Sequence, residues 1–428
     1  MREMKDSGIE WIGAIPQDWQ LSKIGSLYTQ QNEKVSDKDY QPLSVTMQGI
    51  LPQLATAAKT DDGDNRKLVR VGDFAINSRS DRRGSCGISP LDGSVSLINI
   101  ILTPRTAMHP GYYNWLFHTT LFADEFYKWG HGIVADLWTT RWQEMKSITV
   151  PVPEYAEQER IAAFLDAECA EIDAVLEKTR ASIEEYKKLK QAVITQAVTK
   201  GIRGDRPMKD SGIEWIGDIP AEFEMLQLKF LCKLITDGTH FSPSTVETGL
   251  PYITAGDVHG IGLDYNSAKR ISEEDFNLLV NQGCQPLKGD VLLVKDGATT
   301  GRVGFVDSDV PCVILSSVAM LRPADNINGH YLMYLLASYF LQNQILVSMA
   351  GSAMPRITLT KLLKYIGLLS PLSEQQEIAD YLDEKCAGID ALIAKKQQYL
   401  TEIENYKKSL IYEYVTGKKE VKTSVLAD

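Results

Sequence analysis

The chain has 428 residues, of which 44% are hydrophobic and 24% are charged, and its formal net charge is −11. This length suits two to four globular units, and the composition excludes a wholly disordered chain. The polar N-terminus and the absence of any apolar run of about 18 residues predict a cytoplasmic protein without a membrane span. Six widely spaced cysteines predict free thiols and argue against a disulfide framework or a zinc site.

A short segment opens the chain and returns near its middle. Residues 4–13 read MKDSGIEWIG and recur identically at 208–217. A second repeat pairs 157–199 with 374–416 without a gap. Such identity indicates an internal duplication, which predicts a pseudo-twofold molecule. Because the second copy of the opening segment follows the first helix, we expect the N-terminus to lie beside the end of the second helix.

The segments between the repeats read as mixed α/β modules. Strand-like runs, such as 74–76 and 291–294, precede helix-like stretches at 112–126 and 331–349. In chain order we expect a repeat box (1–13), a first module (14–153), a central helix (154–201), a linker with the second box (202–217), a second module (218–372), a C-terminal helix (373–417) and a tail (418–428).

The two repeated helices begin after prolines and carry apolar residues at a spacing of three and four. This narrow stripe favours two helices packed on each other, although a helix packed only on its own module remains an alternative. A straight helix over 157–199 would be roughly 65 Å long. The residues expected to pair the helices or dock partners are Trp11, Ile172, Val175, Tyr186, Leu189, Trp215, Ile389, Leu392, Ile403 and Tyr406.

The motifs of an active site are missing. The sequence has no Pro-Pro pair for an amino-methyltransferase motif, no phosphate loop and no nucleophile elbow. Gly130–Ala135 imitates a dinucleotide fingerprint but follows no clear strand. Lys295 and Asp296 suggest nuclease chemistry, yet the supporting carboxylates are absent, and the histidines lack metal-ligand spacing. We therefore predict a non-catalytic chain without a metal or cofactor of its own.

Taken together, the KDSGIEWIG box, the Glu-Gln-x-x-Ile-Ala helix opening, the loops 237–243 and 295–302, and the duplicated layout resemble the DNA-specificity (S) subunit of type I restriction–modification enzymes. The resemblance implies an α+β fold in which two mixed α/β target-recognition domains are separated by two long antiparallel coiled-coil helices. Each domain would read one half of a bipartite site in double-stranded DNA.

The resemblance also implies partners. The helices would set the spacer between the half-sites and, with the boxes, dock two methyltransferase (M) subunits, which restriction/translocase (R) subunits would join. S-adenosylmethionine, ATP and magnesium would belong to those partners. A non-catalytic protein–protein scaffold and a cryptic enzyme are the alternative functions.

Candidate DNA-binding residues come from loops rich in paired donors and acceptors. A basic cluster over 66–83 marks the first module, although an ordinary solvated loop would look the same. The first module has Gln30–Glu33 where the second has Asp237–His240, so the halves should read different sequences and the site should be asymmetric. The candidates are Ser78, Arg79, Arg82, Arg83, His131 and Arg141 in the first module, and Thr239, His240, Lys295, Arg302, Ser352 and Arg356 in the second.

Overall fold

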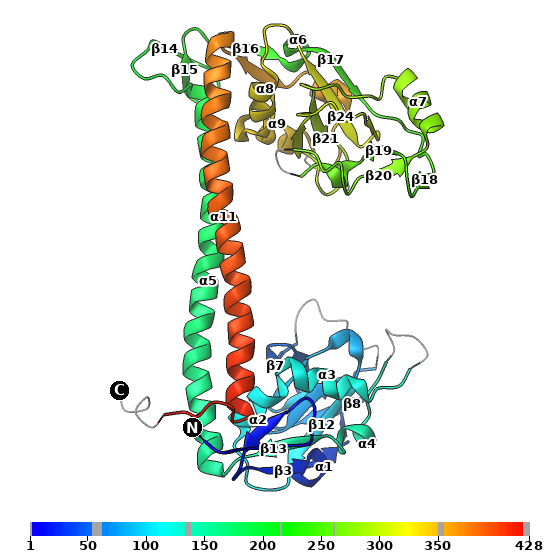
Figure 1. Ribbon diagram of the computed structural model, residues 1–428, viewed down its shortest axis with the longest axis vertical. Coiled ribbons are helices and arrows are strands. Elements are labelled where there is room, and N and C mark those ends of the chain that lie inside the picture. The colour runs from blue at the N-terminus through cyan, green and yellow to red at the C-terminus, as the bar shows by residue number, and fades with distance from the viewer. Residues whose placement is uncertain are drawn as a thin grey trace. The chain divides into compact units, whose positions relative to one another are not determined.

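The computed structural model describes residues 2–53, 62–132, 138–214, 216–259, 262–349 and 355–422. The chain forms two units, one made of Met1–Arg180 with Gln398–Asp428 and the other of Ala181–Gln397. Each unit holds one of the two modules (Figure 1). The long helices α5 (Tyr155–Lys200) and α11 (Leu372–Val415) each contribute one part to each unit.

The first module is built on a four-stranded antiparallel sheet in the order β10–β9–β12–β4. All four residues of β9 are buried, as expected for a strand covered on both faces. Phe117 and Phe122, from the two helices that follow β12, are fully buried in the same core cluster as Phe74. The elements of the sheet and its cover are β4 (Tyr28–Gln31), β9 (Phe74–Asn77), η1 (Ser80–Arg82), β10 (Cys86–Ile88), β12 (Asn99–Pro104), α2 (Pro110–Phe117), α3 (Thr120–Lys128) and α4 (Trp142–Met145).

Smaller sheets complete the first unit. The strands β11, β8 and β5 form one sheet, while β6–β7, β1–β2 and β13–β3 form pairs. These elements are β1 (Met4–Asp6), β2 (Ala14–Pro16), β3 (Gln20–Lys23), α1 (Ile24–Leu27), β5 (Lys34–Val35), β6 (Leu43–Thr46), β7 (Gly49–Pro52), β8 (Arg66–Val69), β11 (Gly93–Val95) and β13 (Thr149–Val152).

The second module repeats this plan with a sheet in the order β22–β21–β24–β17. A second sheet, β18–β20–β19–β23, contains the parallel pair β19–β23. The elements are β14 (Met208–Asp210), β15 (Asp218–Pro220), β16 (Glu224–Gln227), α6 (Leu228–Leu231), β17 (Cys232–Asp237), β18 (Thr245–Val246), β19 (Leu250–Ile253), η3 (Ala255–Asp257), β20 (Lys269–Ile271), α7 (Glu273–Asn281), β21 (Val291–Val294), β22 (Val303–Phe305), β23 (Val313–Ile314), β24 (Val318–Pro323), α8 (Gly329–Ala337), α9 (Tyr339–Met349), α10 (Leu359–Leu362) and β25 (Ile366–Leu369).

The two main sheets therefore have the same strand order, with β4, β9, β10 and β12 matched by β17, β21, β22 and β24. Each sheet is followed by two helices, α2 and α3 in the first module and α8 and α9 in the second. This agreement confirms the duplicated, mixed α/β fold that the sequence predicts.

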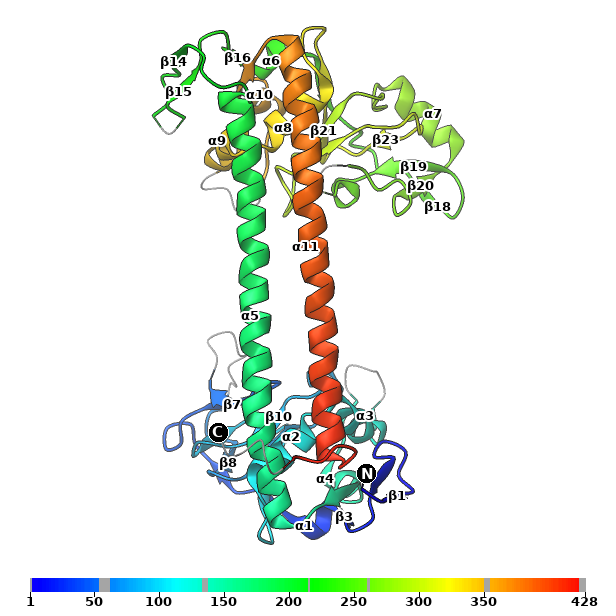
Figure 2. The ribbon, with the colours of Figure 1, turned by 60° about the vertical axis from the view of Figure 1, so that its left-hand side comes forward.

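The long helices run antiparallel within each unit. In the first unit Lys407 pairs with Asp173 at 2.6 Å, and Arg180 pairs with Glu404 at 2.6 Å, so the partner's number falls as the helix advances. In the second unit Lys190 pairs with Asp390 at 2.6 Å. Figure 2 shows α5 in green beside α11 in orange and red. The paired helices that the sequence favours are thereby confirmed.

The buried stripe of each helix differs in phase from the expected one. Among the expected residues, Ile389 is buried and Ile172, Tyr186 and Ile403 are half-buried. Four others are 39–53% exposed and do not belong to the pairing stripe, namely Val175, Leu189, Leu392 and Tyr406. Leu176 and Ile183 take their place on α5, because the stripe advances by four residues after Ile172. Because Val175 and Leu176, the third and fourth residues after Ile172, are both apolar, the spacing alone does not show which of them is buried. Trp215 lies outside the described residues.

The opening box lies against the end of α11 in the first unit, as expected from the repeat order. The Tyr412 hydroxyl donates to the carbonyl of Ile12 at 2.9 Å, and Lys418 donates to the same oxygen. Trp11 is buried and meets the ring of Phe122 edge-on at 5.9 Å. Within the described residues, no helix combines the length and apolarity that crossing a membrane requires.

Candidate nucleic-acid interface

Three short segments of the first module meet just after β9. The amide of Thr140 donates to the carbonyl of Ser78 at 3.0 Å, and Arg79 forms a β-bridge with Thr139. Thr139 also exchanges two backbone hydrogen bonds of 3.0 Å with His131. Backbone contacts therefore bring Arg79 and His131 together, with Arg141 two residues beyond Thr139.

The predicted side chains of this module differ in exposure. Arg79, Arg82, Arg83, His131 and Arg141 are exposed. Arg82 lies 3.7 Å from Asp81, Arg83 pairs with Asp124, and the His131 ring lies 3.9 Å from Glu144. The module thus presents several partly neutralised cations beside the sheet, a surface suited to phosphate or base edges.

Other members of the basic cluster turn inward. Arg66 is buried and its guanidinium donates to the side chain and carbonyl of Ser94 at 2.8 and 2.9 Å. Lys67 donates to the carbonyl of Asn99 at 2.7 Å, and burial lowers the pKa of both basic groups. Arg70 is exposed and pairs with Glu33 at 2.8 Å. Arg66 and Lys67 therefore do not contribute to the exposed basic surface, whereas Arg70 and Arg79 do.

The second module repeats the backbone contacts that join the two residues after β9, Ser78 and Arg79, to Thr140 and Thr139. We call this arrangement the frame. The amide of Ile357 donates to the carbonyl of Lys295 at 2.8 Å, and Asp296 forms a β-bridge with Arg356. These two contacts match the hydrogen bond between Thr140 and Ser78 and the bridge between Arg79 and Thr139 in the first module. Ser78 therefore corresponds to Lys295, Arg79 to Asp296, Thr139 to Arg356 and Thr140 to Ile357.

The corresponding side chains have different chemistry. Lys295 is 3% exposed, and its ammonium lies 2.8 Å from Asp296 and 3.3 Å from Asp237. Asp296 also pairs with Nε of Arg356 at 3.1 Å, while the Arg356 side chain remains 62% exposed. His240 lies 4.0 Å from Asp237 and is 72% exposed. The second module thus has an ion cluster around a buried lysine where the first has a neutral serine.

Several residues that the sequence predicts to contact DNA have buried side chains that hold nearby loops. The buried Ser78 hydroxyl donates to the carbonyl of Ile98 at 2.6 Å, and the buried Thr239 hydroxyl accepts from the amide of Phe241 at 2.9 Å. Because a buried side chain cannot reach a base edge, we revise Ser78, Thr239 and Lys295 from DNA contacts to residues that hold the loops. Arg302 is half-buried and donates to the carbonyl of Val258 at 3.2 Å.

The remaining predicted residue, Ser352, lies outside the described residues. Sequence reasoning also missed Asp237 and Thr139, which complete the two frames. A usable signal was present, because Ser78 and Lys295, like Thr139 and Arg356, lie 217 residues apart, the offset of the helix repeat.

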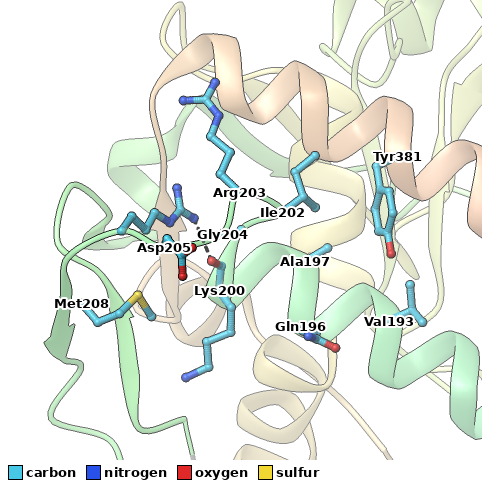
Figure 3. Close-up of a pocket in the computed structure, with 12 residues that line it drawn as sticks. Val193, Gln196, Ala197, Lys200, Ile202, Arg203, Gly204, Asp205, Met208 and Tyr381 are labelled. Atoms are coloured by element: carbon cyan, nitrogen blue, oxygen red, sulfur yellow. Dashed lines mark hydrogen bonds between the residues drawn. The ribbon is translucent and has the colours of Figure 1, made fainter.

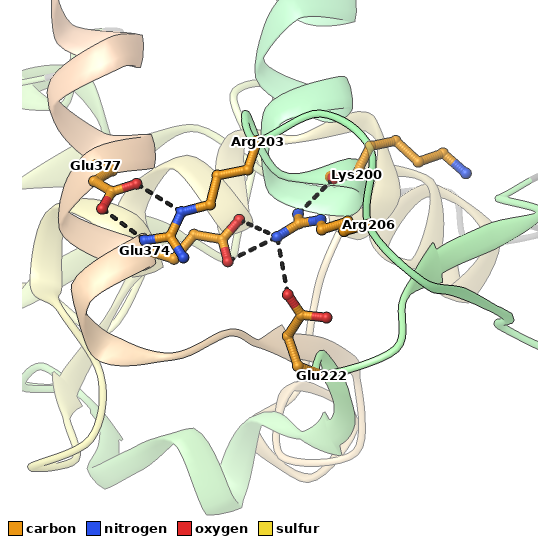
Figure 4. Close-up of polar contacts among 6 residues, drawn as sticks. All are labelled: Lys200, Arg203, Arg206, Glu222, Glu374 and Glu377. Carbon is orange, nitrogen blue, oxygen red and sulfur yellow. Dashed lines mark hydrogen bonds and ion pairs between the residues drawn. The ribbon is translucent and has the colours of Figure 1, made fainter.

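A second pair of matched sites holds each box to the start of a long helix. Arg206 pairs with Glu374 at 2.6 Å and with Glu222 at 3.1 Å (Figure 4). Its guanidinium also lies 5.0 Å from the centre of the Phe223 ring. In the first unit Arg2 pairs in the same way with Glu157 and Asp18, over the ring of Trp19.

A pocket of about 570 Å³ lies beside this junction in the second unit (Figure 3). Its wall includes Ala197 of α5 and Tyr381 of α11. At the matching place in the first unit, Tyr414 packs on Phe164 with ring centres 4.4 Å apart. The smaller Ala197 therefore accounts for the open space. In the described part of the chain, no three or more His, Cys, Asp or Glu side chains are grouped to hold a metal ion.

Comparison with known proteins shows that the chain is similar to DNA-specificity subunits. Residues 220–404 match the family described as "Type I restriction modification DNA specificity domain". The chain is 27% identical over 285 residues to the type I restriction enzyme MjaVIII specificity subunit of Methanocaldococcus jannaschii, covering 65% of this chain and 63% of that protein. It is 24% identical over 281 residues to the EcoBI specificity subunit of Escherichia coli, covering 64% and 59%. The match thus spans about three fifths of these curated relatives.

Solved structures share the fold across nearly the whole chain. One, from a study of complex assembly and conformational transition of the type I R-M system, has a TM-score of 0.71 at 16% identity, covering 95% of this chain and 99% of that chain. The HsdS subunit from Thermoanaerobacter tengcongensis has a TM-score of 0.50 at 18% identity, covering 95% and 98%.

Proposed function

Because residues 220–404 match the type I restriction modification DNA specificity domain, and curated specificity subunits are similar to the chain, we propose that it reads a two-part sequence in double-stranded DNA for a type I complex in the cytoplasm. It selects the site and leaves methyl transfer and cleavage to other subunits. Each module reads one half of the site, and the two halves have different sequences.

The observation that carries this proposal is one backbone frame with two sets of side chains. Both modules join the strand β9 or β21 to the segment before α4 or α10 by the same hydrogen bonds. The exposed group at this frame is Arg79 in one module and Arg356 in the other, at positions that do not correspond. Such a frame supports unlike recognition surfaces on a common fold, as a bipartite and asymmetric site requires.

The chemistry of the exposed groups fits reading from the major groove. An arginine fork donates two hydrogen bonds to O6 and N7 of guanine, which distinguishes that base from the other three. Arg79 and Arg356 are the residues we assign to such contacts. Arg82 and Arg83, already close to carboxylates, suit phosphate contacts that fix the register.

The long helices serve two further roles in this proposal. They set the spacer between the half-sites, since each helix contributes to both units. With the boxes, they also dock two methyltransferase (M) subunits, which restriction/translocase (R) subunits join. The exposed Val175, Leu189, Leu392 and Tyr406 are available for docking because they lie outside the pairing stripe. S-adenosylmethionine, ATP and magnesium belong to these partners.

The test is a single-molecule methylation map of host DNA with and without the gene for this chain. Loss of one bipartite adenine-methylation motif on deletion is the expected result, and it also identifies the target. An unchanged map in a host whose methyltransferase subunit is expressed would favour a scaffold that binds only proteins. Purified alone, the chain should neither methylate nor cleave DNA.

A further inference from the structure

Resting on the proposed function, we propose that Lys295 is a positioning residue that, through Asp296, aims the exposed Arg356 at a guanine of the second half-site. The geometry is a chain of charges that runs from the core to the surface. The Lys295 ammonium, 3% exposed, lies 2.8 Å from one oxygen of Asp296. The other oxygen of Asp296 lies 3.1 Å from Nε of Arg356, whose side chain is 62% exposed.

Lys295 also fixes the position of the strand ends. Its ammonium lies 3.3 Å from Asp237, the last residue of β17, while its own residue directly follows β21. An ammonium has three donors, so one buried lysine can hold two carboxylates at once. Without that positive charge, Asp237 and Asp296 would repel each other and the support under Arg356 would move.

The first module provides an internal comparison. At the same place in the frame it has Ser78, whose hydroxyl donates to the carbonyl of Ile98 at 2.6 Å. Folding of the frame therefore does not require a buried charge. Because burying ions carries a large desolvation cost, the Lys295 cluster is better explained by orientation of Arg356 than by stability.

The contact on Nε decides what Arg356 presents. The Asp296 carboxylate, 3.1 Å from Nε, holds the guanidinium by charge, as an ion pair without hydrogen-bond alignment, and among the described residues neither terminal amino group has an ion pair of its own. Those two groups form the fork that matches the paired acceptors of guanine. The positive charges of Lys295 and Arg356 balance the negative charges of Asp237 and Asp296. The cluster therefore contributes to base selectivity more than to general attraction to phosphate.

The experiment uses the full chain bound to its methyltransferase subunits. The probes are duplexes of the mapped site and every single-base variant of both half-sites. Arg356→Ala is expected to reduce discrimination at one position of the second half-site by about 5- to 150-fold. Lys295→Met and Asp296→Asn should reduce discrimination at that same position. The double variant Lys295→Met with Arg356→Ala should be no worse than Arg356→Ala alone, because both changes remove one contact.

Two controls separate orientation from folding. The first half-site, read in the same molecule, should be unaffected by all three single variants. Lys233→Met removes another ion-paired lysine of the same module, on Asp325, and should change neither half-site. If Lys295→Met lowers the yield of folded protein, the near-isosteric Asp296→Asn decides, since it removes the charge and keeps the shape.

The outcomes distinguish this inference from the proposed function. If wild-type chain gives no bipartite motif, the proposed function fails. If the motif is present but Lys295→Met relaxes another position, or its effect adds fully to that of Arg356→Ala, the positioning role is wrong. A loss of affinity that is equal on all sequences, with a shallower dependence of affinity on salt than the wild-type chain shows, would make Arg356 a phosphate contact instead.

Discussion

Removing the arginine at each box–helix junction should destabilise the two units by different amounts. In the second unit, Arg206→Met leaves the Glu374 carboxylate, which is 0% exposed, without the partner it meets at 2.6 Å. Leaving a buried charge unpaired costs about 3–5 kcal/mol. In the first unit, Arg2→Met leaves Glu157, which is 14% exposed, with the Trp19 ring N–H as a donor at 2.9 Å.

The difference comes from one aromatic residue. Phe223 occupies the place of Trp19 in the second unit, and a phenyl ring has no N–H to donate. A hydrogen bond to a charged group contributes about 1.5–3 kcal/mol. We therefore expect Arg2→Met to cost less than Arg206→Met by about that amount, with the greater exposure of Glu157 adding to the difference.

Hydrogen–deuterium exchange resolves the two units separately, which a single melting curve does not. Amides at the start of α11 and in β14–β15 should exchange about two to three and a half orders of magnitude faster in Arg206→Met. The acceleration at the start of α5 and in β1–β2 should be smaller in Arg2→Met. Adding Trp19→Phe to Arg2→Met should bring the first unit close to the behaviour of the second. Equal acceleration in the two single variants, or no effect of Trp19→Phe, would refute this reasoning.

Four further results are expected. Arg79→Ala should relax one base pair of the first half-site by about 1–3 kcal/mol, read by methylation mapping, and an equal loss on all sequences would make it a phosphate contact. Inserting seven residues after Arg180 and seven after Gln397 keeps the helical phase and adds about 10 Å, so the mapped spacer should grow by about 3 base pairs. An unchanged spacer would exclude the proposal that the long helices set its length. Folded chain should resist a thiol reagent at pH 8, because burial raises the pKa of Cys232 and Cys312 to about 12, and rapid labelling of either would contradict that burial. The same raised pKa values mean that the unfolded chain binds fewer protons between about pH 9 and 12, so stability should fall as pH rises there, and the urea midpoint should be lower at pH 10.5 than at pH 7.5.

The sequence predicted the features that repeat locally. The identical boxes and the second repeat indicated two long helices and two modules, and α5 and α11 include the whole of 157–199 and all but the last residue of 374–416. The order of strands was not predicted, because β4 pairs with β12 about 70 residues away and no local pattern encodes that choice. The phase of the helix stripe was also missed, since Val175 and Leu176 are both apolar and only packing selects Leu176.

The candidate interface was predicted by residue type and only partly by position. Arginine and histidine in loops pointed to Arg79, His131 and Arg356, which are exposed at the frames. Lys295 was chosen for its charge, but its burial depends on Asp237, which is 58 residues earlier and meets it only through β24. Burial of a charged side chain is a property of the assembled sheet, so residue type could not reveal it.

The two frames explain how one fold can change its recognition surface without refolding. Every contact that joins Ser78 to Thr140, or Lys295 to Ile357, is made by backbone atoms. Side chains at these positions can therefore be replaced while the frame stays closed, as Arg79 and Asp296 illustrate with opposite charges at one place. A replaced surface group still needs a supporting residue beneath it. The modules provide that support differently, by a neutral serine hydroxyl in one and by a buried lysine paired with two carboxylates in the other. A new reading residue should thus transfer between the modules only when the residue beneath it is transferred as well.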